Sequence, residues 1–264
     1  MYKALTIAGS DSGGGAGIQA DLKTFMAHGV YGASVITAIT VQNTLGVRAF
    51  EALSPLLVAG QIDAVLDDIG ANAIKTGMLA STEVVEVVVE TLSRYKVVNL
   101  VVDPVMVAQS GDPLLAMEAV NAIRERLLPM AVLITPNLPE AGFLLNRSVE
   151  QEQDMYDAAR DLHTLGPRYV LLKGGHLAGD IVDVLYDGTS FHTLRSPRIP
   201  TRHTHGTGCT YASAITALLA QGTPMEQSVN QAHTYVLEAI RHAQAIGRGD
   251  SPVHHLWRGL PKLV

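Results

Sequence analysis

Short apolar runs alternate along the chain with longer segments in which apolar positions recur at helical spacing. Glycine, proline and polar residues bound the apolar runs, which is typical of buried strands. We expect strands at Lys3–Ala8, Ser34–Thr40, Ala73–Lys75, Asn99–Asp103, Val132–Thr135, Tyr169–Lys173, Val182–Tyr186 and Ser190–Leu194. The last two are separated by Asp187, Gly188 and Thr189, a hairpin-type turn.

The longer segments predict helices. We expect them at Gly17–His28, Ser54–Asp68, Thr82–Tyr95, Leu115–Leu127, Pro139–Leu145, Gln151–Leu165, Gly208–Ala220 and Met225–Ile246. Strands and helices alternate, which implies right-handed β-α-β units and a mainly parallel sheet. The sequence contains no repeat or long linker, so we expect one α/β domain over residues 1–264.

Composition supports this fold class and narrows the possible partners. Hydrophobic residues make up 47% of the chain and charged residues only 17%, which indicates a sheet buried on both faces. The formal charge of -6 gives no reason to expect a nucleic-acid partner, because phosphate contacts need clustered lysine and arginine. No apolar run is long enough to predict a membrane span. The single cysteine, Cys209, excludes an intramolecular disulfide and favours a cytoplasmic setting.

A glycine-rich segment, Gly9–Gly17, joins the first expected strand to the first expected helix. Glycines at this position allow the backbone to approach a ligand closely. The segment lacks the lysine of a phosphate-binding P-loop and does not match the dinucleotide-binding fingerprint. It is therefore either a ligand-binding loop or only a tight turn between a strand and a helix.

A second motif, Thr204–Thr210, places two glycines directly before a strongly apolar helix. Free N–H groups at a helix start bind anions, and a phosphoryl group in transfer is such an anion. Cys209 would lie in the first helical turn, where we expect a lowered pKa and a role as base or nucleophile. The alternative is a buried, inert cysteine.

Several other polar residues follow expected strands. Asp103 ends one strand, and Asn137 and Glu140 follow another. Two carboxylates suit Mg²⁺, although Glu140 alone could simply complement a helix dipole. Lys173 ends a strand before two glycines and is placed to meet a phosphate. The ten histidines show no zinc-ligand spacing, so we do not expect a zinc site.

Together these motifs resemble the ribokinase-like superfamily, and more narrowly the hydroxymethylpyrimidine/phosphomethylpyrimidine kinases of thiamine biosynthesis. The resemblance extends from Ala4 to about His255. The segments that carry it are Ala4–Asp11, Gly14–Thr24, Gln42–Gly46, Asp103–Met106, Ser110–Leu115, Ile134–Glu140, Leu172–Leu177 and Thr204–Thr210.

The resemblance implies a three-layer α/β/α sandwich, ATP and Mg²⁺ as cofactors, and a homodimer. It implies two successive phosphoryl transfers, to a hydroxymethylpyrimidine and then to its monophosphate. It also assigns roles to residues. The anion hole would consist of Gly206, Thr207 and Gly208, with Cys209 as the base. Mg²⁺ would be held by Asp103 and Glu140, and ATP would face Asn137, Lys173 and Thr204. The pyrimidine would be bound by Ala16, Asp21, Gln42, Met78 and Val105.

The chain departs from the family pattern at several positions. Ser12 and Gly13 replace a proline and a serine of the usual glycine-rich loop, His203 replaces an asparagine, and Tyr211 replaces a small aliphatic residue. Two alternatives therefore stand beside the pyrimidine kinase interpretation: a cysteine-containing pyridoxal kinase, and a non-catalytic pyrimidine-binding relative.

Overall fold

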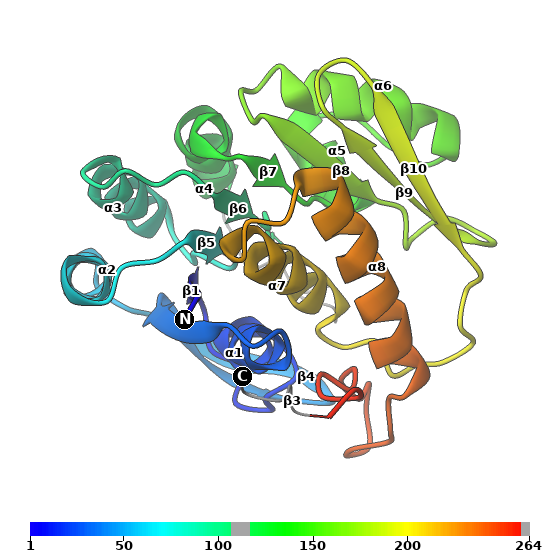
Figure 1. Ribbon diagram of the computed structural model, residues 1–264, viewed down its shortest axis with the longest axis horizontal. Coiled ribbons are helices and arrows are strands. Elements are labelled where there is room, and N and C mark those ends of the chain that lie inside the picture. Colours follow the sequence, from blue (N-terminus) through cyan, green and yellow to red (C-terminus); the bar gives the residue numbers. More distant parts are fainter. Residues whose placement is uncertain (107–116, 260–264) are drawn as a thin grey trace.

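The computed structural model describes residues 1–106 and 117–259, and its centre is an eight-stranded sheet (Figure 1). The strand order is β10-β9-β8-β7-β6-β5-β1-β2. All neighbouring pairs from β8 to β2 are parallel, whereas β9 and β10 are antiparallel additions at one edge. The bounds are β1 Lys3–Ala8, β2 Tyr31–Ile36, β5 Ala73–Thr76, β6 Leu100–Val102, β7 Leu133–Ile134, β8 Tyr169–Lys173, β9 Ile181–Tyr186 and β10 Phe191–Ser196. The expected mainly parallel sheet is confirmed.

Helices cover both faces of this sheet. Side chains alternate along each strand, so neighbours such as Leu100 and Val101 belong to two separate hydrophobic cores. One face carries α1 Gly17–Ala27, α7 Thr207–Ala220 and α8 Met225–Arg241. The other carries α2 Pro55–Asp68, α3 Thr82–Ser93, α4 Met117–Ala122, α5 Leu138–Leu145 and α6 Glu152–His163. The result is the expected three-layer α/β/α arrangement.

A separate two-stranded hairpin was not predicted. It consists of β3 Ala38–Asn43 and β4 Gly46–Ala52. The expected strand Ser34–Thr40 is wrong in its bounds, because β2 ends at Ile36 and β3 begins at Ala38. The apolar run continues across Thr37, whose N–H donates to Ala8 and whose carbonyl accepts from Leu53. Hydrophobicity alone therefore does not reveal where the chain leaves the main sheet.

Two helix ends also differ from expectation. The helix expected to reach Ile246 ends at Arg241, because the chain folds back and the hydroxyl of Ser251 bonds both the N–H and the carbonyl of Ile246. The helix expected over Leu115–Leu127 is α4 followed by a π-helical turn, Ile123–Leu127. Its first two residues, and the whole Ser110–Leu115 segment that carried the resemblance, lie outside the described residues, which resume at residue 117.

The carboxyl ends of β1, β5, β6 and β8 meet along one edge of the sheet, and the glycine-rich segment and the start of α7 lie beside them. Ligands bind at this edge in open α/β sheets. In the two described ranges, no helix is long and apolar enough to cross a membrane.

Candidate active site

A cleft of about 820 Å³ runs along this edge of the sheet. With the exception of Asp21, every site residue expected from the sequence lines it. These residues are Ala16, Gln42, Met78, Val105, Asp103, Asn137, Glu140, Lys173, Thr204, Gly206, Thr207, Gly208 and Cys209. Residues far apart in the sequence therefore share one cavity.

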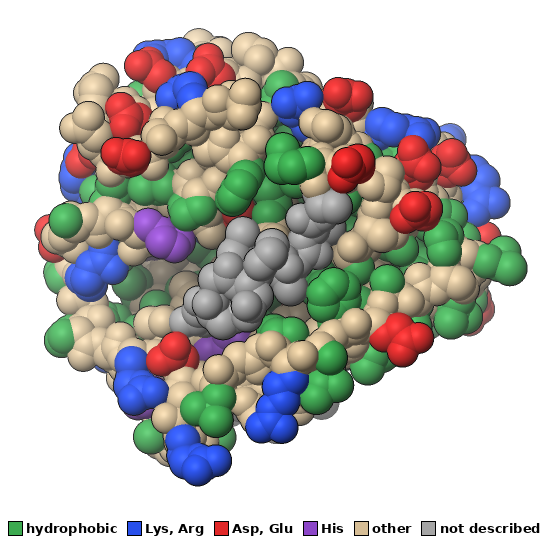
Figure 2. All heavy atoms as spheres, turned by 180° about the vertical axis from the view of Figure 1, so that it is seen from behind, with side chains coloured by type: hydrophobic (Ala, Val, Ile, Leu, Met, Phe, Trp, Pro, Cys, Tyr) green, Lys and Arg blue, Asp and Glu red, His purple; other side chains and the backbone are tan. Residues whose placement is uncertain are grey.

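The face drawn in Figure 2 carries no continuous patch of basic side chains among the described residues. Lysine and arginine side chains are interspersed there with acidic ones. In the described part of the chain, three positively charged side chains line the cleft: Lys173, Arg198 and the fully buried Lys75.

The glycine-rich segment wraps around the carboxylate of Asp11. This side chain accepts hydrogen bonds from the backbone N–H groups of Gly13, Gly15 and Ala16 at 2.7, 3.0 and 2.8 Å. The imidazole Nε2 of His205 lies 2.9 Å from the same carboxylate. Burial opposes ionisation of Asp11, but these contacts hold its pKa below the usual range. Asp11 and His205 thus tie the glycine-rich segment to the loop before α7, a role that the sequence motifs did not reveal.

Helix α7 begins with an open N-terminus facing the cleft. Gly206 is its N-cap and adopts a left-handed conformation, with φ of 78°, and no side chain in the described parts of the chain caps it. The hydroxyl of Thr207 is occupied with the carbonyl of Thr204, at 2.6 Å. The backbone N–H of Thr207 also donates to the Thr204 carbonyl, at 3.2 Å. Within the described residues, the N–H groups of Gly206, Gly208 and Cys209 are therefore the donors available to an anion.

Cys209 lies half-buried in the cleft wall, where the nearby backbone N–H of Gly17 acts to lower the pKa of the thiol. Burial raises its pKa to about 11, and Asp21 and Asp103 add to the rise. The ammonium group of Lys75 acts in the opposite direction but does not outweigh them. The expectation of a lowered pKa is therefore wrong, because the thiol is more strongly desolvated than a position at a helix start suggests.

Asp103 and Lys173 form an ion pair across the ends of β6 and β8. The lysine Nζ lies 3.0 Å from Oδ1 of Asp103, and the hydroxyl of Thr135 donates to the same oxygen at 2.9 Å. Burial opposes ionisation of Asp103, but Lys173 and Lys75 hold its pKa below the usual range. The pKa of Lys173 is correspondingly raised, against the effect of burial, by Asp103 and Glu140.

Asn137 and Glu140 form a capping box at the start of α5. The Asn137 side chain accepts from the Glu140 N–H at 2.9 Å, and the Glu140 carboxylate accepts from the Asn137 N–H at 2.8 Å. Glu140 nevertheless lines the cleft, so its capping role and its position in the site coexist. Burial raises the pKa of Glu140 to about 7, and the negative charge of Asp103 contributes.

The donor set fits Mg²⁺. Among residues 1–106 and 117–259, no three His, Cys, Asp or Glu side chains gather closely enough to hold a metal ion by themselves. Mg²⁺ commonly takes one or two carboxylates and completes its shell with water and substrate phosphates. Asp103 and Glu140 supply two oxygen donors of this kind. The pKa of Glu140 is raised mainly by burial and further by the negative charge of Asp103, which a bound cation would offset.

The expected pyrimidine residues separate into two groups. Ala16, Gln42, Met78 and Val105 line the cleft. Asp21 is fully buried below it, bonded to Lys75, so the expectation that it touches a ligand is corrected.

Ser12, one of the departures from the family pattern, fixes the backbone at Gln42. Its hydroxyl donates to the Gln42 carbonyl at 2.7 Å and accepts from the Gln42 N–H at 2.8 Å. The glycine-rich segment therefore positions the side chain that we expect to recognise the pyrimidine.

The far end of the cleft contains polar residues that the sequence did not single out as a group. Asp183, Tyr211 and His233 line it beside apolar residues of α8. The rings of Tyr211 and His233 lie 6.2 Å apart, and His233 Nε2 lies 3.9 Å from the Asp183 carboxylate. Burial raises the pKa of Asp183 and of Tyr211 and lowers that of His233. Of these three residues, the family comparison had drawn attention only to Tyr211.

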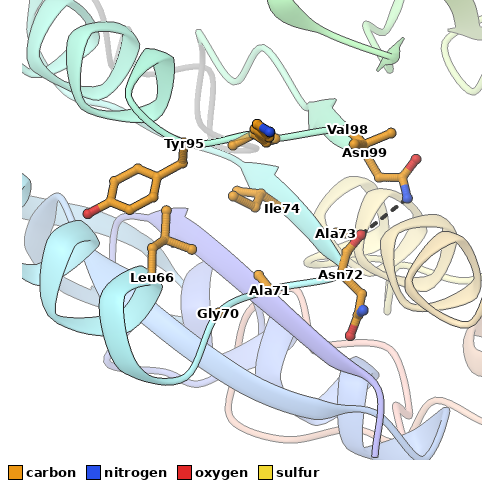
Figure 3. A pocket seen from close by; sticks show the side chains of 11 residues that line it. Leu66, Gly70, Ala71, Asn72, Ala73, Ile74, Tyr95, Val98 and Asn99 are labelled. Atoms are coloured by element: carbon orange, nitrogen blue, oxygen red, sulfur yellow. Dashed lines mark hydrogen bonds between the residues drawn. The ribbon is translucent and has the colours of Figure 1, made fainter.

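A second pocket, of about 180 Å³, lies near the amino ends of β5 and β6 (Figure 3). Leu66, Ala71, Ile74 and Val98 contribute apolar surface, and the side chain of Asn99 donates to the backbone of Asn72 at 3.2 Å. None of the expected site residues lies there, so the larger cleft is the candidate active site.

Known proteins match this chain over nearly its whole length. The phosphomethylpyrimidine kinase family model matches residues 11–254. The hydroxymethylpyrimidine/phosphomethylpyrimidine kinase of Streptomyces coelicolor is 51% identical over 253 residues, which cover 96% of this chain and 94% of that protein. The thiamine biosynthesis bifunctional protein ThiED of Geobacter sulfurreducens is 54% identical over 253 residues, 96% of this chain, but the match spans only 52% of that protein.

A solved structure agrees with the fold. The ADP complex of Bacillus subtilis pyridoxal kinase superposes with a TM-score of 0.89 at 39% sequence identity, covering 97% of both chains.

Proposed function

This chain belongs to the phosphomethylpyrimidine kinase family, and from that premise we propose that it phosphorylates 4-amino-5-hydroxymethyl-2-methylpyrimidine with ATP, and then phosphorylates the monophosphate to the diphosphate, in thiamine biosynthesis. One observation carries the proposal. The open N-terminus of α7, the Asp103–Lys173 pair and Gln42 line a single cleft. A donor phosphate and a pyrimidine acceptor can therefore meet within it.

The phosphate end of the cleft provides positive charge and hydrogen-bond donors. Gly206, Thr207 and Gly208 would form the anion hole for the transferring phosphoryl group, with the N–H groups of Gly206 and Gly208 as its donors. Lys173 would neutralise the charge of that group. Asn137 and Thr204 would contact the remaining ATP phosphates. Asp103 and Glu140 would hold Mg²⁺, which on binding supplies charge neutralisation of the phosphate oxygens. The ADP complex of the B. subtilis relative supports a nucleotide at this site.

The acceptor end suits a flat, partly polar ring. The amide of Gln42 can pair with the ring nitrogen and exocyclic amine of an aminopyrimidine, because it offers both an acceptor and donors. Met78 and Val105 offer apolar contact to the plane of the ring, and Ala16 leaves room beside it.

The two transfers make different demands on Cys209. A primary alcohol needs a base to accept its proton, whereas a phosphate monoester is already largely ionised at neutral pH. We assign Cys209 chiefly to the first transfer. With a pKa near 11, its thiol must lose a proton before it can accept one, so groups that favour the thiolate matter for this step.

An ATP-consumption assay tests the function. We expect ADP to form with the hydroxymethylpyrimidine and again with its monophosphate. Pyridoxal is the second candidate acceptor, because the fold also matches a pyridoxal kinase. Turnover with pyridoxal alone would identify the chain as a pyridoxal kinase. No turnover with any of the three acceptors would indicate a non-catalytic binding protein.

We further propose that the chain is one kinase domain that works in the cytoplasm as a homodimer. The single cysteine suits a reducing compartment. The hairpin β3–β4 exposes Ile39, Val41 and Phe50, apolar side chains that a second copy could cover. Sedimentation equilibrium should give a mass close to twice 28.1 kDa, and a monomer at micromolar concentration would contradict the dimer.

A further inference from the structure

A buried ion pair lies directly beneath the cleft. The Nζ atom of Lys75, on β5, lies 2.9 Å from both carboxylate oxygens of Asp21, on α1. Both side chains are fully buried, and Lys75 lies directly beneath the surface of the cleft that it lines. A Cβ on Gly77 would lie 3.1 Å from the Lys75 Nζ, so the ammonium group is held in a tight space.

Two contacts between α1 and α7 place this pair beside Cys209. The backbone N–H of Gly17, at the start of α1, is near enough to Cys209 to lower the pKa of its thiol. One helical turn further along both helices, the hydroxyl of Ser213 donates to Asp21 Oδ1 at 2.6 Å. Residues four apart share a helix face, so Asp21 faces α7 one turn below Cys209 and its partner Lys75 lies under the same face.

Burial of this ion pair costs desolvation free energy, so a gain in stability does not by itself explain the pair. Two charges removed from water often contribute no net stability compared with apolar residues of similar size. Asp21 needs further hydrogen bonds, from Ser213 and from the Thr6 hydroxyl at 2.6 Å, to compensate. This arrangement fixes a positive charge under the acceptor site, which an apolar floor would not provide.

The two lysines that line the cleft form ion pairs with different carboxylates. Lys173 pairs with Asp103, which also accepts from Thr135, at the phosphate end. Lys75 pairs with Asp21 on the side of α1 and α7. Lys75 is thus the lysine associated with the wall that holds Cys209.

We propose that Lys75 is a positioning residue: its ammonium group, held by Asp21, stabilises the thiolate of Cys209, which accepts the proton of the substrate alcohol. The catalytic part of this inference rests on the proposed function. As the alcohol oxygen bonds to the γ-phosphorus of ATP and the bond to the β–γ bridging oxygen breaks, the hydroxyl proton passes to the sulfur. The thiol then returns that proton to solvent.

The charges around Cys209 agree with this role. Two positive charges act on the thiol, those of Lys75 on β5 and Lys173 at the end of β8. Two negative charges oppose them, those of Asp21 on α1 and of Asp103, which directly follows β6. Burial has the largest effect on the pKa of the thiol and raises it; among the charges, Lys75 has the largest effect and lowers it.

The single cysteine makes the inference directly measurable. Because Cys209 is the only thiol in the chain, its alkylation by iodoacetamide reports the thiolate without any substrate. A rise of one unit in the pKa lowers the thiolate fraction tenfold but makes each thiolate about threefold more nucleophilic, so the net rate falls by about threefold. We expect Lys75→Met to slow alkylation at pH 8 to 9 by at least that factor.

The opposite variant separates charge from structure. Asp21→Asn removes a negative charge near Cys209 and should accelerate alkylation. A purely structural role would make both substitutions loosen the site, and both rates would then change in the same direction. That result, or no change in either rate, would overturn the inference. The exposed Lys96→Met is the matched control and should alkylate as the unsubstituted protein does.

A double variant covers the case in which one single variant does not fold, as judged by circular dichroism. The double variant Lys75→Met/Asp21→Asn removes both charges of the pair, so no unpaired charge is left buried. Since Lys75 acts on the thiol more strongly than Asp21, the double variant should remain slower than the unsubstituted protein. An equal or faster rate would contradict the inference.

Kinetics link the charge to the reaction. Lys75→Met should lower kcat for the alcohol by a larger factor than kcat for the monophosphate. If alkylation changes as expected but no pyrimidine is phosphorylated, the proposed function fails while the Lys75–Cys209 coupling stands. If both phosphorylations proceed and alkylation is unchanged, the coupling fails while the function stands.

Discussion

Gly206 packs so closely against Gly15 that a Cβ on Gly206 would lie 1.8 Å from the Gly15 carbonyl oxygen. The contact joins the loop before α7 to the glycine-rich segment near the chain's N-terminus. Only a residue without a side chain allows the two backbones to approach in this way. The anion site and the acceptor site are thus built against each other.

Gly206→Ala should abolish both transfers. The new methyl group would collide with the Gly15 backbone, and alanine disfavours the φ of 78° that Gly206 adopts. We expect kcat to fall by at least ~100-fold with either pyrimidine substrate, because displaced N–H donors no longer match the transferring phosphoryl group. Gly60→Ala is the control: nothing lies within 4 Å of its added Cβ, and it should keep full activity. Normal turnover in Gly206→Ala would refute the anion hole.

Cys209→Ala should affect the two transfers unequally. Loss of a positioned proton acceptor typically costs ~10²- to 10⁴-fold, and only the alcohol requires one. Phosphorylation of the monophosphate should fall by less than about tenfold, since that acceptor is already ionised. Separate kcat measurements on the two substrates provide the check. Equal losses would mean that Cys209 positions the phosphate or has a structural role.

Glu140 should make the protein less stable as the pH rises. Its pKa of about 7 in the folded state exceeds its ordinary value of 4.5, so the folded state binds more protons between these two values. The free energy of unfolding therefore falls as the pH increases from 4.5 to 7, by on the order of 1–3 kcal/mol, and stays reduced above that.

Glu140→Gln should remove this pH dependence while keeping an acceptor for the Asn137 N–H. Urea unfolding at several pH values without Mg²⁺ measures the effect, and the exposed Glu125→Gln should leave the profile unchanged. A profile in Glu140→Gln identical to that of the unsubstituted protein would mean that Glu140 is ionised at neutral pH.

Binding of Mg²⁺ and ATP should release protons near pH 6.5. A carboxylate must be ionised to hold the metal, and Glu140 is largely protonated below pH 7. Calorimetry in two buffers of different ionisation enthalpy gives the number of protons released. The number should fall in Glu140→Gln; no difference between the two proteins would exclude Glu140 as the group that ionises.

Lys173→Met should weaken the use of ATP. The substitution removes the ammonium group 3.0 Å from Asp103 and leaves a buried carboxylate without its main counter-charge. We expect kcat/KM for ATP to fall by more than ~100-fold. Lys96→Met, which removes an exposed lysine outside the cleft, should not change it. An unaltered kcat/KM in Lys173→Met would contradict its assignment to the phosphates.

Local patterns were sufficient for most of the architecture. The strands Lys3–Ala8 and Tyr169–Lys173 have the predicted bounds, because each is one largely apolar run whose interior residues are all buried. The hairpin β3–β4 was missed because its large apolar side chains, Ile39, Val41 and Phe50, are exposed. The buried positions of β3 carry the smaller Ala38 and Thr40, so hydrophobicity does not mark its buried face. Local hydrophobicity identifies strands of the central sheet better than a hairpin outside it.

The sequence by itself indicated most of the motif residues that line the cleft, because the motifs follow strands whose carboxyl ends must meet at one edge of a parallel sheet. Tertiary structure decided their chemical state. It buried Asp21 under Lys75, and it desolvated Cys209 so that a thiol expected to be acidic has a pKa near 11. Charge and burial depend on every neighbour in space, and residues as distant in the sequence as Gly17, Lys75 and Cys209 become neighbours only when the chain has folded.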